Sequence, residues 1–216
     1  MKLLALAGRL QSGKDSLGDF LVRNRKELMG VETAKKYGWA DALKQDLADK
    51  FDVPEHLLWG TDEDKNQPTS VQWWDLPHWN DLSESRADIK TFNANGGYLT
   101  IRELLQHWGT EICRSMREDI WVSLAMKRVK ADNCDLAVMI DTRFPNEVAA
   151  VKAAGGKVVR LTRNEGVPTE HQSEYTLDKE RYDVSNFDAV VANNQMTKTQ
   201  AERVLVSLLD QWGWKT

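Results

Sequence analysis

The feature that most constrains this chain is a glycine-rich loop that directly follows an apolar run near the N-terminus. The run Lys2 to Ala7 leads into Gly8, four further residues, and then Gly13 and Lys14. After the loop, apolar residues recur at the spacing of a helix face, at Leu17, Phe20 and Leu21. A strand, a glycine-rich loop and a helix in this order are the context that a phosphate-binding P-loop requires. The sequence therefore predicts a P-loop at residues 8–16.

Each residue type in this loop suits the binding of a phosphate chain. Glycines allow backbone angles at which several N–H groups converge on one anion, and the following helix adds the positive end of its dipole. Lys14 is placed to reach the outer phosphates and to balance charge that develops during transfer. The predicted nucleotide-binding residues are Gly8, Arg9, Gln11, Ser12, Gly13, Lys14, Asp15 and Ser16.

The position after the lysine departs from the usual pattern. It commonly holds a serine or threonine whose hydroxyl binds Mg²⁺, whereas here it is Asp15, and the hydroxyl comes one residue later at Ser16. Because a carboxylate is itself a good Mg²⁺ ligand, the change alters the predicted metal ligands more than the function. Asp141, which follows the apolar run Leu136–Ile140, is a third predicted ligand, and a helix N-cap is its alternative role.

The rest of the chain alternates strands with helices, which is typical of a parallel α/β sheet. The expected strands are 2–7, 33–39, 136–140, 157–161 and 189–192, and the expected helices include 13–25, 41–51, 119–130 and 197–212. Thr100 and Glu103 form a capping-box pattern at the start of a further helix. We expect one domain with a core of 1–51 and 100–216. An insertion at about 52–99 holds three of the five prolines, which favours loops and short helices there.

Composition argues against several classes of protein. No apolar run approaches the ~20 residues that cross a bilayer, so we expect no membrane span. The net charge of -4 argues against an extended nucleic-acid-binding surface, which is usually basic. Cys113 and Cys134 stand in contexts unlike a metal site or a redox pair. They indicate a reducing, cytoplasmic compartment.

Three charged residues are predicted to act with Lys14 in catalysis, namely Asp141, Arg143 and Arg163. Arg143 lies near the same sheet edge as Asp141, where a guanidinium fork can grip phosphate, and a surface salt bridge is its alternative role. Arg163 leads into a polar loop and is expected to close over the phosphates as part of a lid. Arg160 has a weaker claim and is expected to face solvent. Arg102 and Gln106 share one helix face and suit a nucleotide pocket, with a plain polar face as the alternative.

Several blocks of sequence resemble the deoxynucleoside monophosphate kinases of T-even and related tailed phages. They are Gly13–Ser16, Arg102–Glu111 with Asp119–Val122, Asp141–Arg143 with Asn146–Glu147, and Gly155–Arg163. Together they are spread over residues 13–163 of the chain. The Gly-Lys-Asp loop alone is shared with animal phosphomevalonate kinases, so the order of the blocks carries the resemblance.

The resemblance implies a P-loop kinase fold, in which helices flank a five-stranded parallel sheet and the insertion forms the monophosphate-binding region. It implies transfer of a phosphoryl group from ATP to a deoxynucleoside monophosphate with Mg²⁺. It also implies a homodimer, as in the T-even phage enzyme, and a host cytoplasm for a phage-encoded protein. Trp39, Asp41 and Lys44 resemble the entry to the monophosphate site, with a solvated helix residue as the alternative for Lys44. The predicted substrate-binding residues are Trp39, Asp41, Lys44, Arg102, Gln106 and Arg143.

The sequence leaves two other functions open. One is a P-loop kinase that acts on another acceptor, such as a coenzyme A precursor, a mevalonate phosphate or a modified base within DNA. The other is a nucleotide-binding switch or structural protein with little catalysis. The acidic net charge disfavours a DNA substrate, and the arginines at the sheet edge favour a kinase. The role of His171 stays open, and the cluster of Trp73, Trp74 and Trp79 is expected mostly to pack.

Overall fold

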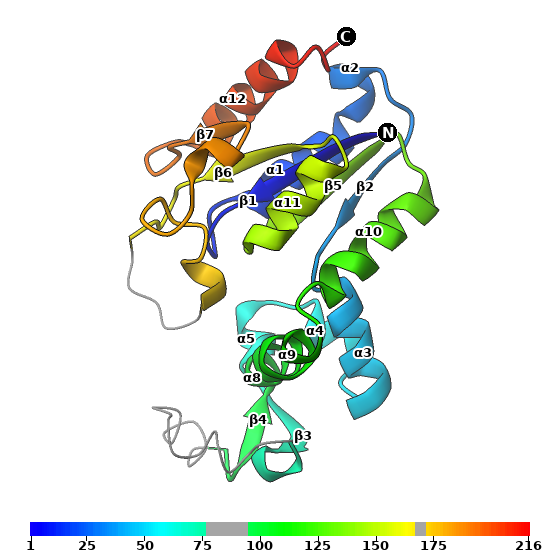
Figure 1. The fold of residues 1–216 in the computed structure, drawn as a ribbon, viewed down its shortest axis with the longest axis vertical. Coiled ribbons are helices and arrows are strands. Elements are labelled where there is room, and N and C mark those ends of the chain that lie inside the picture. The colour runs from blue at the N-terminus through cyan, green and yellow to red at the C-terminus, as the bar shows by residue number, and fades with distance from the viewer. Residues whose placement is uncertain (77–94, 167–171) are drawn as a thin grey trace. The chain divides into compact units, whose positions relative to one another are not determined.

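The computed structural model describes residues 1–76, 95–166 and 172–216 (Figure 1). The chain forms two compact units, of which the first contains residues 1–39 and 122–216 and the second contains residues 40–121. Each unit has hydrophobic core residues of its own. The second unit is wider than the insertion expected at 52–99, because side chains of α3 (Asp41–Phe51) and α8 (Ile101–Gln106) belong to its core.

The first unit is built on one parallel sheet. Its strands are β1 (Lys2–Ala7), β2 (Ala34–Tyr37), β5 (Leu136–Thr142), β6 (Lys157–Leu161) and β7 (Ala189–Val191). The strand order is β2-β5-β1-β6-β7, and every neighbouring pair is parallel. The predicted five-stranded α/β fold is therefore confirmed. Because β1 is the central strand, the loop that follows it emerges between the carboxyl ends of β5 and β6, where open α/β sheets bind ligands.

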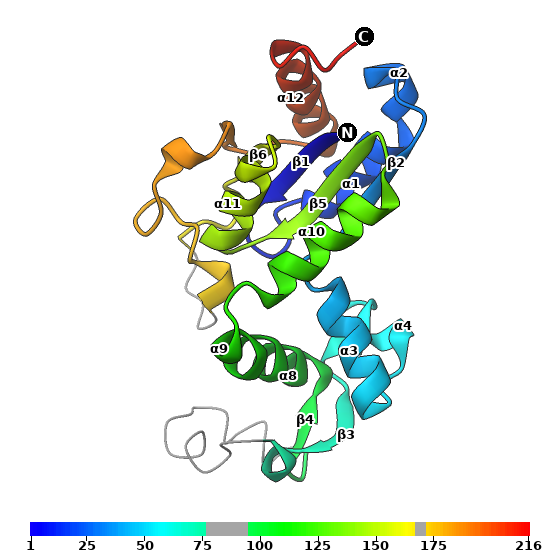
Figure 2. The ribbon, with the colours of Figure 1, turned by 45° about the vertical axis from the view of Figure 1, so that its right-hand side comes forward.

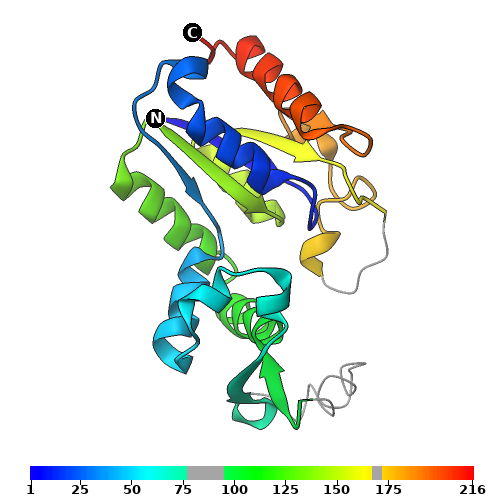
Figure 3. The same ribbon diagram turned by 180° about the vertical axis from the view of Figure 1, so that it is seen from behind.

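Helices cover both faces of this sheet because side chains alternate along the strands. Leu3, Ala5 and Ala7 of β1 join one core cluster, and Leu4 and Leu6 join the other. The first face is covered by α10 (Ile120–Asp132) and α11 (Pro145–Ala153), which lie in front of the sheet in Figure 2. The second face is covered by α1 (Lys14–Arg23) and α12 (Lys198–Gln211), which are seen in Figure 3. The short helix α2 (Arg25–Met29) adds Met29 to the second cluster.

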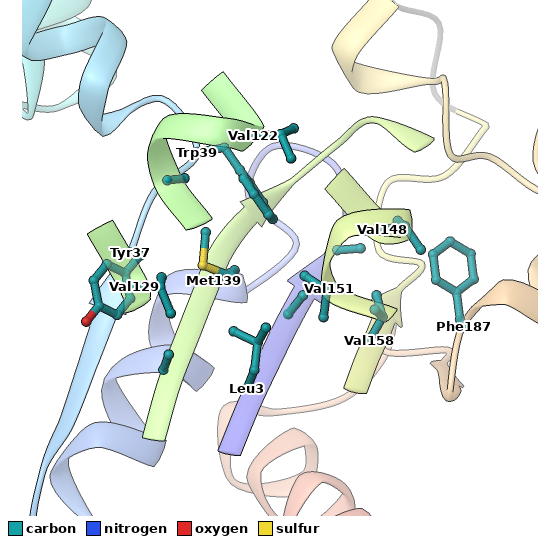
Figure 4. Close-up of a cluster of buried hydrophobic side chains, with 14 of the residues drawn as sticks. Leu3, Tyr37, Trp39, Val122, Val129, Met139, Val148, Val151, Val158 and Phe187 are labelled. Carbon is teal, nitrogen blue, oxygen red and sulfur yellow. The ribbon is translucent and has the colours of Figure 1, made fainter. Parts of the chain in front are cut away.

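Figure 4 shows the first of these clusters from close by. Strand residues such as Leu3 and Met139 meet Val129 of α10 and Val151 of α11, and Phe187 closes one end. All of these side chains are less than one tenth exposed, so the sheet is a rigid support for the loops at its edge.

The second unit consists mostly of short elements around its own core. They are α3, α4 (Glu55–Leu58), α5 (Asp62–Lys65), β3 (Pro68–Gln72), β4 (Tyr98–Thr100), α8 and α9 (Arg114–Met116). The capping box predicted at Thr100 is confirmed, because Glu103 N donates to Thr100 Oγ1 at 3.2 Å and the Glu103 carboxylate accepts from Thr100 N at 2.7 Å. The antiparallel pair β3 and β4 was not expected, because its register joins Pro68 to Thr100 across a long stretch of sequence.

A wide helical turn follows α8 at residues 107–113. Such π-type turns leave backbone carbonyls without their usual helical partner. The carbonyl of Gly109 instead accepts a hydrogen bond from the indole of Trp121 at 2.9 Å. A Cβ at Gly109 would lie 2.5 Å from Leu43 of α3, so glycine allows the two helices to approach closely.

Two expectations concern residues that the structure describes only in part. Trp73 is buried in the second core and Trp74 is exposed, whereas Trp79 lies outside the described residues. His171 also lies outside them. Among the described residues, no helix is long and apolar enough to cross a membrane.

Candidate active site

The loop between β1 and α1 has the backbone geometry that its glycines permit. Gly13 precedes α1 with a φ of +96°, a conformation that residues with a Cβ rarely adopt. A Cβ at Gly8 would lie 2.6 Å from Ser12 Oγ and 3.0 Å from the carbonyl oxygen of Leu161. Both glycines are therefore required for the loop to close on itself beside β6.

Lys14 is buried inside this loop, although it is a lysine. Its Nζ donates to the carbonyl of Arg9 at 2.6 Å and to Ser12 Oγ at 3.3 Å. Burial chiefly, with repulsion by the nearby Arg143, lowers the pKa of Lys14 from 10.5 to about 7, while Asp141 and Asp15 act in the opposite direction. Lys14 therefore loses its proton more readily than an exposed lysine does.

Arginines and carboxylates surround the loop in a buried network. Arg9 forms an ion pair with Asp178, and Arg160 Nη2 donates to the same carboxylate at 2.8 Å. Arg160 is also 3.5 Å from Glu165. The expectation that Arg160 faces solvent is wrong, because Arg160 is only 3% exposed. Its guanidinium lies at the sheet edge, where the Asp178 carboxylate compensates its charge.

Glu174 bridges the loop and Arg143. Its carboxylate accepts a hydrogen bond from the backbone N–H of Leu10 at 2.7 Å and forms an ion pair with the Arg143 guanidinium. The backbone of Arg143 is fixed separately, because its N–H donates to the buried Glu147 carboxylate at 2.7 Å. Arg143 therefore lies beside the loop in an ion pair, and its contact with phosphate stays a prediction.

Asp141 lies within β5 rather than after it, since the strand extends to Thr142. Its carboxylate accepts from the backbone N–H of Trp39 at 2.7 Å and so joins the ends of β2 and β5. It is not the cap of the following helix. The indole of Trp39 is buried in the first core, and its Nε1 donates to Thr142 Oγ1 at 2.9 Å. This placement makes the Trp39 side chain a packing group, and its contact with a substrate stays a prediction.

Oxygen donors suited to Mg²⁺ are present at this edge. The Asp15 side chain is 75% exposed at the start of α1, with Lys36 Nζ 3.9 Å from it, and Ser16 is exposed beside it. The Asp141 carboxylate comes from the neighbouring strand β5. Hard oxygen ligands of this kind fit Mg²⁺, which takes few protein ligands and completes its shell with water and phosphate.

Arg163 is held by the loop that follows β7. Its guanidinium donates to the carbonyls of Asn193 at 2.9 Å and Met196 at 2.8 Å. These contacts support the 193–196 loop, and the role of Arg163 as a lid residue stays a prediction.

The predicted substrate-binding residues of the second unit lie in two places. Lys44 Nζ lies 5.2 Å from the ring centroid of Trp59, and the Trp59 indole donates to Asp41 at 3.3 Å. Arg102 donates instead to Asp62 at 2.8 Å and to Asn66 at 3.1 Å, which ties α8 to α5. Gln106 lies half-buried at the end of α8.

A glycine-rich loop that follows the central parallel strand, begins a helix and encloses a buried lysine is the arrangement of a P-loop nucleotide-binding fold. The family model for deoxynucleotide monophosphate kinase matches residues 75–204, more than half of the chain, and the chain belongs to that family. A protein of Acanthamoeba polyphaga mimivirus, named "Putative deoxynucleotide monophosphate kinase", is 25% identical over 213 residues, covering 90% of each chain. The predicted family and its class of reaction are confirmed. A phage origin stays a prediction.

Sequence reasoning missed the residues that hold the site together. Asp178, Asn193 and Glu147 are all buried and polar, which only the folded structure reveals. Glu174 lies close in sequence to His171, whose role stayed open. A sequence signal existed for Asn193, which directly follows the expected strand 189–192, and for Glu147, which stands in one of the blocks that carry the resemblance. Asp178 lies far from the end of any expected strand.

Replacing Asp178 with asparagine is expected to destabilise the fold by about 3 kcal/mol, because two buried guanidinium groups would lose their shared counter-charge. Urea denaturation followed by circular dichroism measures this free energy of unfolding. Asp210→Asn, an exposed change on α12, serves as the matched control and should have little effect. An unchanged unfolding free energy for Asp178→Asn would show that the buried network contributes no stability.

Binding of an ATP analogue at pH 8 is expected to take up about one proton. Free Lys14, with a pKa of about 7, is mostly neutral at that pH, and a bound triphosphate raises its pKa so that it becomes charged. The affinity for the analogue should therefore fall as pH rises above 7. Isothermal titration calorimetry in two buffers of different ionisation enthalpy measures the uptake. Lys14→Gln should remove it, and an equal uptake in that variant would contradict the assignment.

Proposed function

We propose that this protein transfers the γ-phosphoryl group of ATP to the 5′-phosphate of a deoxynucleoside monophosphate, with Mg²⁺. The observation that carries the proposal is a lysine buried within a glycine-rich loop at the carboxyl end of the central strand. Burial is the main cause of the lowered pKa of Lys14, and repulsion by Arg143 adds to it. A bound triphosphate would supply negative charge that favours the protonated lysine. The family match supports the same reaction.

The roles of the site residues follow from what phosphoryl transfer needs. The reaction requires alignment of donor and acceptor and stabilisation of charge on the transferring group, with no covalent intermediate on the protein. We assign Lys14 and the loop amides to the β- and γ-phosphates of ATP. Arg143 would balance charge on the transferring group, since a guanidinium carries five N–H donors and can contact phosphate while paired with Glu174.

A magnesium ion would be held by Asp15, Ser16 and Asp141, the oxygen donors at the carboxyl end of β5 and the start of α1. When bound, such an ion neutralises phosphate charge and orients the phosphate chain. The tie between Asp141 and the Trp39 backbone would keep the carboxylate in place before the ion arrives.

The second unit would bind the acceptor monophosphate. This proposal assigns to all of residues 40–121 the monophosphate-binding function that the resemblance implies for the insertion at about 52–99. Lys44 and Arg102 are the cations proposed for the acceptor phosphate, and Gln106 is proposed for a base edge. A homodimer, which the resemblance implies, would be measured by light scattering on the purified chain.

Wild-type protein is expected to release ADP from ATP in the presence of at least one common deoxynucleoside monophosphate. Lys14→Ala should lower kcat about 100-fold or more, because a charge-stabilising donor at the transferring group is lost. A coupled ADP-release assay across all common deoxynucleotide and ribonucleotide monophosphates measures both. Lys26→Ala, an exposed lysine on α2, is the control with normal turnover. Background rates with every acceptor would refute the proposed function.

Asp15→Asn is expected to raise the Mg²⁺ concentration needed for half-maximal turnover about tenfold, because a neutral amide is a weaker ligand for this cation than a carboxylate. Initial rates over a magnesium titration at fixed ATP measure the shift. Asp19→Asn changes a neighbouring carboxylate on the same helix, which pairs with Lys36, and should leave the midpoint near the wild-type value. Equal midpoints for wild type and Asp15→Asn would remove Asp15 from the metal site.

A further inference from the structure

Asn193 is a buried polar residue that the proposed mechanism does not use. It lies after β7 and is only 1% exposed. A buried amide needs partners for both its donor and its acceptor atoms. The hydrogen bonds of Asn193 therefore help to fix the conformation of the segments that it contacts.

The partners of Asn193 belong to two separate segments of the first unit. Its Nδ2 donates to the carbonyl of Ser12 in the P-loop at 2.8 Å. Its Oδ1 accepts from the backbone N–H of Arg163 at 3.0 Å, and its own carbonyl accepts from the Arg163 guanidinium. One side chain thus joins the P-loop to the segment that follows β6.

The hydrogen bond to Ser12 has a consequence for the next residue. A trans peptide unit is planar, and its C=O and N–H point in opposite directions. Fixing the carbonyl of Ser12 toward Asn193 therefore fixes the N–H of Gly13 toward the other side. The glycine imposes little steric preference of its own on this peptide unit, because Gly13 has a φ of +96° and no side chain.

We propose that Asn193 is a positioning residue that locks the Ser12–Gly13 peptide, so that the Gly13 N–H is held toward the phosphates of ATP. This inference rests on the proposed use of the loop for ATP. A flipped peptide would present a carbonyl oxygen to the phosphates instead, and a carbonyl repels an anion. Asn193 would act without touching the nucleotide itself.

The test uses two substitutions of similar size and one matched control. Asn193→Leu removes both side-chain hydrogen bonds, and Asn193→Asp keeps the acceptor for Arg163 but loses the donor to Ser12. Asn194→Asp makes the same chemical change at the exposed neighbouring residue. We expect both Asn193 variants to bind an ATP analogue about 10- to 100-fold more weakly, since the hydrogen bond from the Gly13 N–H to the charged phosphates would be lost. The control should bind within about twofold of wild type.

Steady-state kinetics separate positioning from general stability. A positioning role predicts a raised KM for ATP and a lowered kcat, with the KM for the deoxynucleotide unchanged, in variants that still unfold cooperatively. A lowered melting temperature with wild-type KM for ATP would overturn the proposal. If the wild type binds ATP but phosphorylates no monophosphate, the proposed function fails while the binding test of Asn193 still stands.

A measurement on unmutated protein covers the case in which the variants do not fold. In protein labelled with ¹⁵N-glycine, the amide signal of Gly13 should move downfield when ADP is added, because its N–H gains a charge-assisted hydrogen bond. An unmoved Gly13 signal at saturating ADP would overturn the proposal.

Discussion

The site depends on the burial of one ammonium group at the end of the central strand. Lys14 is enclosed by the loop that it belongs to, and its Nζ is held by the carbonyl of Arg9. Burial and neighbouring guanidinium groups make its charge unfavourable until an anion arrives. The rest of the first unit provides the rigid sheet edge and the counter-charges that make this arrangement stable.

Those counter-charges come largely from one short segment. Glu174 and Asp178 both lie between β6 and β7, and they compensate Arg143, Arg9 and Arg160. The same segment also contacts the P-loop backbone through Leu10. A substitution at Glu174 or Asp178 would therefore alter the surroundings of the P-loop, although neither residue belongs to that loop.

The two units have separate hydrophobic cores. The first unit follows the architecture of a P-loop phosphotransferase, and its strand order places the loop at the sheet's ligand-binding edge. The second unit is built from short helices, a two-stranded sheet and a wide helical turn around Leu47, Leu58 and Leu104. The family model spans parts of both units, namely residues 75–121 of the second and 122–204 of the first.

Much of the fold could be predicted from sequence, because its signals are local. The β1 strand, the helix after Lys14 and the Thr100 capping box are each encoded within a few consecutive residues. The antiparallel pair of Pro68–Gln72 with Tyr98–Thr100 was missed, since neither strand is long enough to show a pattern alone. The wide turn at 107–113 was missed as well, because its apolar spacing is that of an ordinary helix.

The sequence by itself determined the phosphate loop, the α/β class and the family resemblance, because glycine spacing and apolar periodicity act over short distances along the chain. Only the tertiary structure decided which charges are paired and which are buried. Asn193 meets Ser12 across 181 residues, and Arg9 meets Asp178 across 169. Such partners are set by how parallel strands align at one sheet edge, where distant segments meet, and no local pattern records that alignment.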